Sequence, residues 1–267
     1  MKNKLVIVTG ASSGIGKACA LEFAKKGANL VLAARSVDKL EIISKEISLL
    51  GVEVLCVPTD VSKEEDCKIL MDKSLAKFGK IDVLVNNAGI SMRAAFAELD
   101  LEVLKKVMDV NFWGTVYCTR YAIKSILENK GSVVGVSSIA GYKGLPGRTG
   151  YSASKFAMHG FLEALRIENL NNDLHVLLAC PGFTASNIRN SALAADGSSQ
   201  GETPRDEQKM MQPEEVAEAI VVAVIKRKDR LTLTTNGKLT VFLNKFFPKW
   251  VDRMVYNHMS QEPDSPF

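Results

Sequence analysis

The chain has 267 residues, of which 46% are hydrophobic and 24% are charged, and its formal net charge is +4. This composition is ordinary for a soluble globular protein with a large core, and the length allows one large α/β domain or two small ones. The basic residues are scattered rather than clustered, which argues against a nucleic-acid partner.

The five cysteines are odd in number and show no paired metal-ligand spacing, so we expect reduced thiols, no metal site and a cytoplasmic location. The amino terminus carries no signal-peptide pattern. No apolar run approaches the ~20 residues that span a bilayer, so we expect no transmembrane helix.

The first apolar run, Leu5 to Val8, is typical of a strand buried on both faces of a parallel sheet. It ends in a glycine-rich turn that precedes a helical segment reaching about Lys26. Such a turn binds phosphate at the helix amino terminus, although a tight turn without a ligand is the alternative. The cofactor-binding candidates here are Gly10, Ser12, Ser13, Gly14, Ile15 and Gly16.

The second predicted strand, Asn29 to Ala33, is followed by Arg35 and Ser36, and no carboxylate appears before Asp38. An acidic residue at this point binds the adenosine ribose, whereas an arginine pairs with a 2′-phosphate. We therefore favour NADP(H) as cofactor and keep NAD(H) as the alternative. A solvated arginine at a helix start is the competing interpretation.

Strands and helices then alternate along the chain, which predicts an α/β doubly wound parallel sheet of about seven strands with helices on both faces. The further predicted strands cover 52–57, 81–85, 131–136 and 173–179, and the main helices cover 40–50, a segment ending at 78, 101–129 and a segment beginning at 151. Polar and glycine-containing turns follow several of these strands, at Asp60, at Asn86-Asn87-Ala88-Gly89 and at Pro181-Gly182. Asp60 could hold an adenine edge or cap a turn, and the asparagines could form a plain turn.

Tyr151 and Lys155 stand four residues apart in a predicted helix, so both side chains project from one face. A neighbouring ammonium favours the phenolate, which makes Tyr151 a candidate acid. Taken alone, this spacing is better interpreted as an ordinary helix start with a solvated lysine. Asn111 lies among apolar neighbours inside the long predicted helix, so we expect it to have a specific hydrogen-bond partner.

Together these motifs resemble the short-chain dehydrogenase/reductase superfamily over about residues 4–185. The resemblance is carried by Thr9-Gly10-x-x-x-Gly14-x-Gly16, Asp60, Asn86-Asn87-Ala88-Gly89, Asn111, Ser138, Tyr151-x-x-x-Lys155 and Pro181-Gly182. It implies a single Rossmann-type domain and a catalytic tetrad of Asn111, Ser138, Tyr151 and Lys155. Ser138 fits better than Ser137 because the family's serine stands thirteen positions before the tyrosine, and 151 − 138 = 13.

The resemblance also implies a role for each residue of the tetrad. Tyr151 exchanges a proton with the substrate oxygen, Lys155 lowers the tyrosine pKa and holds the nicotinamide ribose, Ser138 binds the same oxygen, and Asn111 anchors a proton-relaying water. The further cofactor contacts implied are Asp60, Val61, Asn87, Ala88, Gly89, Tyr151, Lys155, Pro181, Gly182 and Thr184.

We expect a catalytic domain over residues 1–237, with a mobile substrate lid at about 184–212 because this segment is long, polar and lacks periodicity. The candidate walls of the substrate site are Ile90, Met92, Ala140, Tyr142, Leu145, Pro146 and Phe183, which favour an apolar ketone, steroid-like or lipid carbonyl substrate. The alternatives are a 3-oxoacyl thioester reductase and a sensor or scaffold that binds NADP(H) without turnover. A complete tetrad argues for an enzyme.

Residues 238–267, named here the C-terminal extension, place apolar residues at near-helical spacing, interrupted by Pro248, with lysines and an arginine among them. The extension is more similar to those of steroid, retinoid and lipid-carbonyl reductases of the superfamily than to those of oxoacyl-carrier-protein reductases. We expect the stripe to pack on the chain's own core or on a partner subunit, with membrane-surface contact as the less favoured alternative. The resemblance implies a homodimer or homotetramer.

Overall fold

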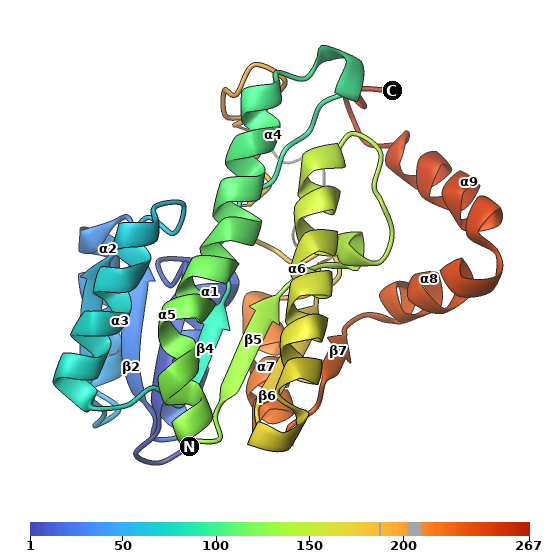
Figure 1. Ribbon diagram of the computed structural model, residues 1–267. Helices are drawn as coiled ribbons and strands as arrows, with labels where there is room; N and C mark the ends of the chain where they lie inside the picture. The colour runs from blue at the N-terminus through green and yellow to red at the C-terminus, as the bar shows by residue number, and fades with distance from the viewer. Residues whose placement is uncertain (187, 202–209) are drawn as a thin grey trace.

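The computed structural model describes residues 1–186, 188–201 and 210–267. Seven parallel strands form one sheet in the order β3-β2-β1-β4-β5-β6-β7 (Figure 1). The strands are β1 (Leu5–Thr9), β2 (Asn29–Ala34), β3 (Val54–Pro58), β4 (Val83–Asn86), β5 (Ser132–Val136), β6 (His175–Cys180) and β7 (Arg230–Thr232). The predicted fold class is therefore confirmed. The chain reverses direction across the sheet between β1 and β4, which is where ligands bind in doubly wound sheets.

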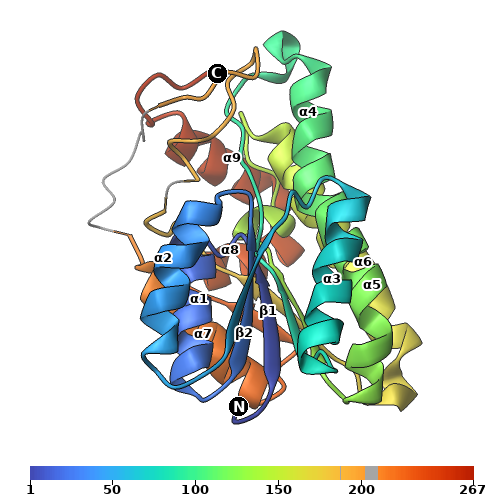
Figure 2. The same cartoon turned by 90° about the vertical axis from the view of Figure 1, so that its left-hand side faces the viewer.

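Helices cover both faces of the sheet, with α1, α2 and α7 on one side and α3, α5 and α6 on the other (Figure 2). The helices are α1 (Gly14–Lys25), α2 (Val37–Ser48), α3 (Glu64–Phe78), α4 (Leu101–Met108), α5 (Gly114–Glu128), α6 (Thr149–Glu168), α7 (Pro213–Ile225), α8 (Thr235–Phe246) and α9 (Pro248–Met259). None of the helices in the described part of the chain is long and apolar enough to cross a bilayer.

The continuous apolar sequence of β1 follows from burial on both faces. Val6 and Val8 belong to one hydrophobic cluster, which also contains residues of α1, α2 and α7. Leu5 and Ile7 belong to the second cluster, which contains residues of α3, α5 and α6. Because alternate side chains of a strand point to opposite faces, a doubly covered strand needs apolar residues at every position.

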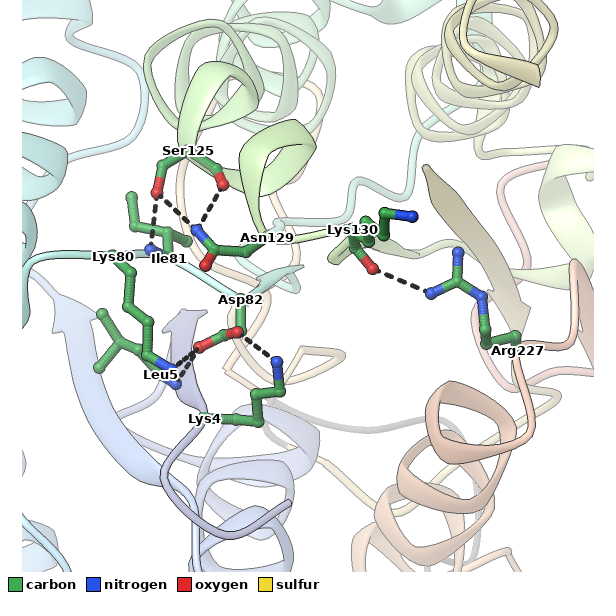
Figure 3. Close-up of polar contacts among 9 residues, drawn as sticks. All are labelled: Lys4, Leu5, Lys80, Ile81, Asp82, Ser125, Asn129, Lys130 and Arg227. Atoms are coloured by element: carbon green, nitrogen blue, oxygen red, sulfur yellow. Dashed lines mark hydrogen bonds and ion pairs between the residues drawn. The ribbon is translucent and has the colours of Figure 1, made fainter. Parts of the chain in front are cut away.

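The amino-terminal edge of the sheet is closed by a buried carboxylate (Figure 3). Asp82 is 2% exposed and accepts hydrogen bonds from the Lys4 ammonium at 2.7 Å and from the Leu5 backbone N–H at 2.8 Å, and Lys80 lies 3.2 Å away. The Ser125 hydroxyl accepts a hydrogen bond from the Ile81 N–H at 2.8 Å. These contacts join β1, β4 and α5 at the end opposite the polar turns, which leaves the carboxyl ends of the strands to form a site.

The structure differs from the predicted helix over 101–129, which is two helices separated by a π-helical turn, Asp109–Trp113. A π turn holds one residue more than an α turn, and such turns are frequent at functional sites. The turn contains Asn111, whose side chain bonds to groups outside the helix. Periodicity along the sequence cannot reveal these bonds.

The two helices of the C-terminal extension meet near Pro248 and form a V beside β7 (Figure 1). Val251, Val255 and Met259 of α9 are buried and form a cluster with Leu145 and other side chains, so this part packs on the chain's own core as expected. In α8, by contrast, Gly237 is the residue that is buried. Large apolar side chains are at least half exposed at Leu239, Phe242, Phe246, Phe247 and Trp250.

Candidate active site

The glycine-rich turn between β1 and α1 has the conformation that the sequence predicts. Gly10 has φ +64°, in the region that favours glycine. A Cβ on Gly16 would lie 2.2 Å from the Gly10 carbonyl oxygen, so only glycine lets α1 start this close to the turn. Among the described residues no side chain caps α1, whose preceding residue, Ser13, is extended and exposed. Its terminal N–H groups can therefore donate hydrogen bonds to an anion, and the cradle fits a dinucleotide pyrophosphate.

Thr9 joins this turn to the loop after β4, a role that the sequence motif alone did not indicate. Its hydroxyl oxygen accepts hydrogen bonds from the backbone N–H groups of Asn87 and Ala88, both at 3.0 Å, and donates to the Val85 carbonyl at 3.3 Å. The Asn87 side chain donates to the Thr9 carbonyl at 2.9 Å. The Asn86 to Gly89 segment is therefore part of the same cradle rather than a plain surface turn.

The residues after β2 and β3 lie at the same edge of the sheet. Arg35 and Ser36 are exposed, and Ser36 immediately precedes α2. Asp60 accepts hydrogen bonds from the Ser62 N–H at 3.1 Å and from its hydroxyl at 2.7 Å, so it caps a turn. Val61 is 8% exposed and lies against Gly114, where an added Cβ would approach it within 2.8 Å.

Asn111 is fully buried in the π turn and has specific partners, as expected. Its side-chain oxygen accepts a hydrogen bond from the Ile90 N–H at 2.8 Å, and its amide donates to the Ile90 carbonyl and to the Ser154 hydroxyl, both at 2.9 Å. A Cβ on Gly89 would lie 3.2 Å from the Asn111 oxygen and 3.6 Å from the Lys155 ammonium. Asn111 thus ties the loop after β4 to the helix that carries Lys155.

Tyr151 lies in the first turn of α6 and lines the same cavity as Ser138. Burial raises the pKa of the Tyr151 phenol, while the Ser138 hydroxyl and the positive charges of Arg148 and Arg189 act in the lowering direction. The neighbouring Ser137 instead bonds His159 Nε2 at 2.7 Å. Both serines line the cavity, and the choice of Ser138 as the catalytic serine stays a prediction.

Lys155 lies on the same helical face as Tyr151, with its nitrogen 5.7 Å from the centre of the tyrosine ring. It donates a hydrogen bond to the Val136 carbonyl at 3.0 Å. Burial lowers the pKa of the Lys155 ammonium to about 8. The cations that act in the lowering direction on the Tyr151 pKa include Arg148 and Arg189, and the role expected for Lys155 stays a prediction.

A cavity of about 130 Å³ brings these groups together. Its polar lining includes Asn87, Ser91, Ser138, Arg148, Tyr151, Lys155, Thr184 and Arg189, and its apolar lining includes Ile15, Leu145, Phe183 and Ile188. Pro181 and Gly182 lie in the same wall, and Thr184 donates to the Gly182 carbonyl at 3.2 Å. The turns after β1, β4, β5 and β6 therefore face one small space.

Some of the residues predicted as substrate walls line this cavity, and others do not. Leu145 and Phe183 line the cavity, and Pro146 lines an adjacent open groove of about 950 Å³. Of the described residues that line the cavity, none is Ile90, Met92, Ala140 or Tyr142. Met92 packs in a separate cluster with Leu193, while Ala140 is fully buried, so both belong to the interior.

The segment predicted as a lid is partly packed. Leu193 is 8% exposed, and its backbone exchanges hydrogen bonds with Arg93 and Ser91, each 2.9 Å long. Ile188 and Arg189 line the cavity. The residues 187 and 202–209 of this segment lie outside the described part of the chain.

Sequence reasoning missed a second polar cluster behind the cavity. His159 contacts Ser137, lies 3.6 Å from the Cys180 sulfur and packs edge-on against the Tyr142 ring. Burial lowers the pKa of His159 to about 4, so the imidazole is neutral near pH 7. Its helical position four residues after Lys155 was the available signal. Across the described residues, His, Cys, Asp and Glu side chains form no group able to hold a metal ion.

Comparison with known proteins identifies the family of the chain. The sequence profile of the family described as short chain dehydrogenase matches residues 4–197. The chain is 42% identical to 11-beta-hydroxysteroid dehydrogenase-like 2 of Arabidopsis thaliana over 69% of its own length and 60% of that protein's. It is 36% identical to 11-beta-hydroxysteroid dehydrogenase A of Sesamum indicum over 98% of the chain and 78% of that protein.

Solved structures share the fold of this chain. An alcohol dehydrogenase from Thermococcus sibiricus complexed with 5-hydroxy-NADP superimposes with a TM-score of 0.77 at 30% identity, covering 86% of this chain and 95% of that one. A short chain dehydrogenase/reductase from Burkholderia phymatum in complex with NAD gives 0.82 at 25% identity, with coverages of 93% and 95%. The chain therefore belongs to the short-chain dehydrogenase/reductase family, whose members are nicotinamide-dependent oxidoreductases of hydroxyl and carbonyl groups.

Proposed function

We propose that this chain is an NADP(H)-dependent oxidoreductase that interconverts a carbonyl compound and its alcohol. The observation that carries the proposal is the single cavity in which Tyr151, Ser138 and Lys155 meet the loop after β4 and the start of α1. A proton donor with a hydrogen-bonding neighbour thus faces the space beside the phosphate cradle. This is the arrangement that hydride transfer with matched proton transfer requires.

Each residue of the tetrad has a distinct task in this proposal. Tyr151 gives its phenol proton to the carbonyl oxygen of the substrate during reduction and takes it back during oxidation. Ser138 donates a hydrogen bond to the same oxygen, where negative charge develops. Lys155 holds the ribose next to the nicotinamide and takes part in returning a proton to the Tyr151 phenol. Asn111 anchors the water through which that proton passes. The bound nicotinamide supplies or accepts the hydride.

The preference for NADP(H) rests on Arg35, which is exposed at the carboxyl end of β2. A guanidinium matches the geometry of a phosphate monoester, and no carboxylate stands before Asp38 to bind a free ribose diol. Ser36 and the turn residues Ser12 and Ser13 are proposed to supply hydroxyl groups that bind the cofactor near this end of the cradle. One of the compared structures contains an NADP derivative and another contains NAD.

The substrate is proposed to be a small molecule whose apolar part packs on Leu145, Phe183 and Ile188. Residues 1–237 are proposed to form the catalytic domain. The described part of the segment 184–212 is proposed to cover the substrate, since Thr184, Ile188 and Arg189 line the cavity. The chain is proposed to act as a homodimer or homotetramer in the cytoplasm. The exposed apolar face of α8 is proposed to be covered by a partner subunit, with membrane contact as the less favoured alternative.

The proposal is tested by NADPH oxidation against a panel of ketones, aldehydes, oxoacyl thioesters and steroids, repeated with NADH. Tyr151→Phe removes the proton donor but keeps the ring, so turnover should be lost while NADPH binding, measured by fluorescence titration, stays within about twofold. Turnover of this variant at the rate of the unmodified chain would remove Tyr151 from the acid role. Inactivity of the unmodified chain towards the whole panel would favour a binding function without catalysis.

A further inference from the structure

A buried ion cluster links the end of the C-terminal extension to the wall of the cavity. The Glu262 carboxylate accepts a hydrogen bond from Arg148 Nη2 at 2.9 Å, and Arg93 Nε lies 3.6 Å from the same oxygen. The side chains of Glu262, Arg148 and Arg93 are 4%, 10% and 6% exposed. Charges this deeply buried are retained only when they are paired and hydrogen-bonded, so this contact fixes the positions of all three residues.

The chain around Glu262 is held in place by further contacts. Arg93 donates a hydrogen bond to the Pro263 carbonyl. Gly147 has φ +69°, and a Cβ there would come within 3.1 Å of Pro266 and of the Phe267 ring. In both views the carboxyl terminus lies at the end of the molecule where α4 and α6 begin (Figures 1 and 2). The last residues therefore pack on the segment that leads directly into α6.

That segment also forms part of the active site. Arg148 immediately precedes α6 and stands three positions before Tyr151. It is one of the residues that line the cavity. Its carbonyl accepts the Ser152 N–H at 2.9 Å, which starts the helix. Glu262 lies far outside the family match, which ends at residue 197. The extension thus supplies a contact that the matched part of the chain does not contain.

We propose that Glu262 is a positioning residue for the proposed oxidoreductase reaction, because its carboxylate holds the Arg148 guanidinium in the cavity wall beside Tyr151. The C-terminal extension is then a structural part of the active site and not an appendage. Truncating it would leave Arg148 buried without its carboxylate partner.

The charges around Tyr151 make this proposal measurable. The titratable groups that face the phenol are Arg148 and Lys155 on α6, Cys180 at the end of β6, and Arg189. Burial and Cys180 raise the pKa of Tyr151, whereas Arg148 and Arg189 lower it. Glu262→Gln leaves the Arg148 charge uncompensated, so the phenol should ionise at lower pH. Arg148→Gln removes a lowering charge, so the phenol should ionise at higher pH.

The experiment measures the ionisation of Tyr151 as the ultraviolet difference between each protein and the same protein carrying Tyr151→Phe. We expect the two substitutions to shift the ionisation midpoint of Tyr151 in opposite directions. The midpoint should lie on the order of half a pH unit lower than in the unmodified chain for Glu262→Gln and higher by a similar amount for Arg148→Gln. Glu262→Asp keeps the charge and should restore the midpoint. Asp264→Asn, an equal change of charge two positions along the extension, should leave it unchanged.

Thermal unfolding identifies any variant that does not fold, and the opposite shifts let either folded variant decide the question. Unshifted midpoints in folded Glu262→Gln or Arg148→Gln would overturn the positioning role, as would an equal shift in Asp264→Asn. The readout needs no substrate, so a chain that reduces no compound of the panel would refute the proposed function without refuting this inference. With an active substrate, the pH of half-maximal kcat/KM should follow the same order.

Discussion

Replacing Thr9 by valine tests whether the phosphate turn and the loop after β4 form one unit. Thr9 is 1% exposed, and its hydroxyl oxygen accepts both the Asn87 and the Ala88 backbone N–H at 3.0 Å. Valine keeps the branched shape that suits strand β1 but offers no acceptor. Both N–H groups would then lack the partner that positions them beside Gly10.

The size of the effect follows from that loss. A buried donor left without a partner costs about 1–3 kcal/mol. Asn87 and Ala88 are half-buried, so water can replace part of the bond and the lower end applies to each. We expect Thr9→Val to lower the free energy of unfolding by about 2 kcal/mol. We also expect NADPH binding to weaken roughly tenfold, because the loop loosens next to the cradle.

Urea denaturation followed by circular dichroism gives the first quantity, and fluorescence titration with NADPH gives the second. Thr9→Ser keeps the hydroxyl and serves as the control, with a much smaller loss in both measurements. Thr9→Val with the stability and affinity of the unmodified chain would refute the argument that the Thr9 hydroxyl connects the two loops.

Three further outcomes are expected. Arg35→Ser should weaken NADPH binding by roughly ten- to a hundredfold and leave NADH binding unchanged, because a charge-assisted pair with the 2′-phosphate is lost; equal effects on both cofactors would contradict this role. Gly16→Ala should weaken cofactor binding at least about tenfold, since its Cβ would lie 2.2 Å from the Gly10 oxygen, whereas Gly160→Ala, whose Cβ meets nothing within 4 Å, should bind normally. The chain should not float with anionic vesicles at moderate salt; flotation that Trp250→Ser abolishes would instead assign the C-terminal extension to a membrane surface.

The elements with strong local signals were predictable from the sequence. Strand β1 is apolar from Leu5 to Val8 because both of its faces are covered, and Gly10 and Gly16 are required by a backbone conformation and a close approach. The Tyr151 and Lys155 pair follows from helical spacing. The register of the sheet is not needed to locate the site, because parallel strands joined through helices place their carboxyl ends at one edge.

Other features depend on contacts between distant residues and leave no local pattern. The π turn occurs together with the bonds of Asn111 to Ile90 and Ser154, whereas the sequence predicts one continuous helix over 101–129. Arg148 and Glu262 are separated by 114 positions, and neither belongs to a motif. Met92 was predicted to line the substrate site, but it packs against Leu193. This packing depends on the path of a loop without periodicity, which the sequence does not reveal.

The π turn at Asp109–Trp113 has a consequence for changes in chain length. An α-helix turns by about 100° per residue, and a π turn takes up one extra residue by widening locally. Deleting one residue from it would leave the orientations of α4 and α5 nearly unchanged, so the apolar face of α5 would stay on the sheet. The deletion would instead close the widened turn in which Asn111 bonds Ile90 and Ser154. Variants of this chain that lack one residue here should therefore keep the packing of α5 but lose the contacts of Asn111.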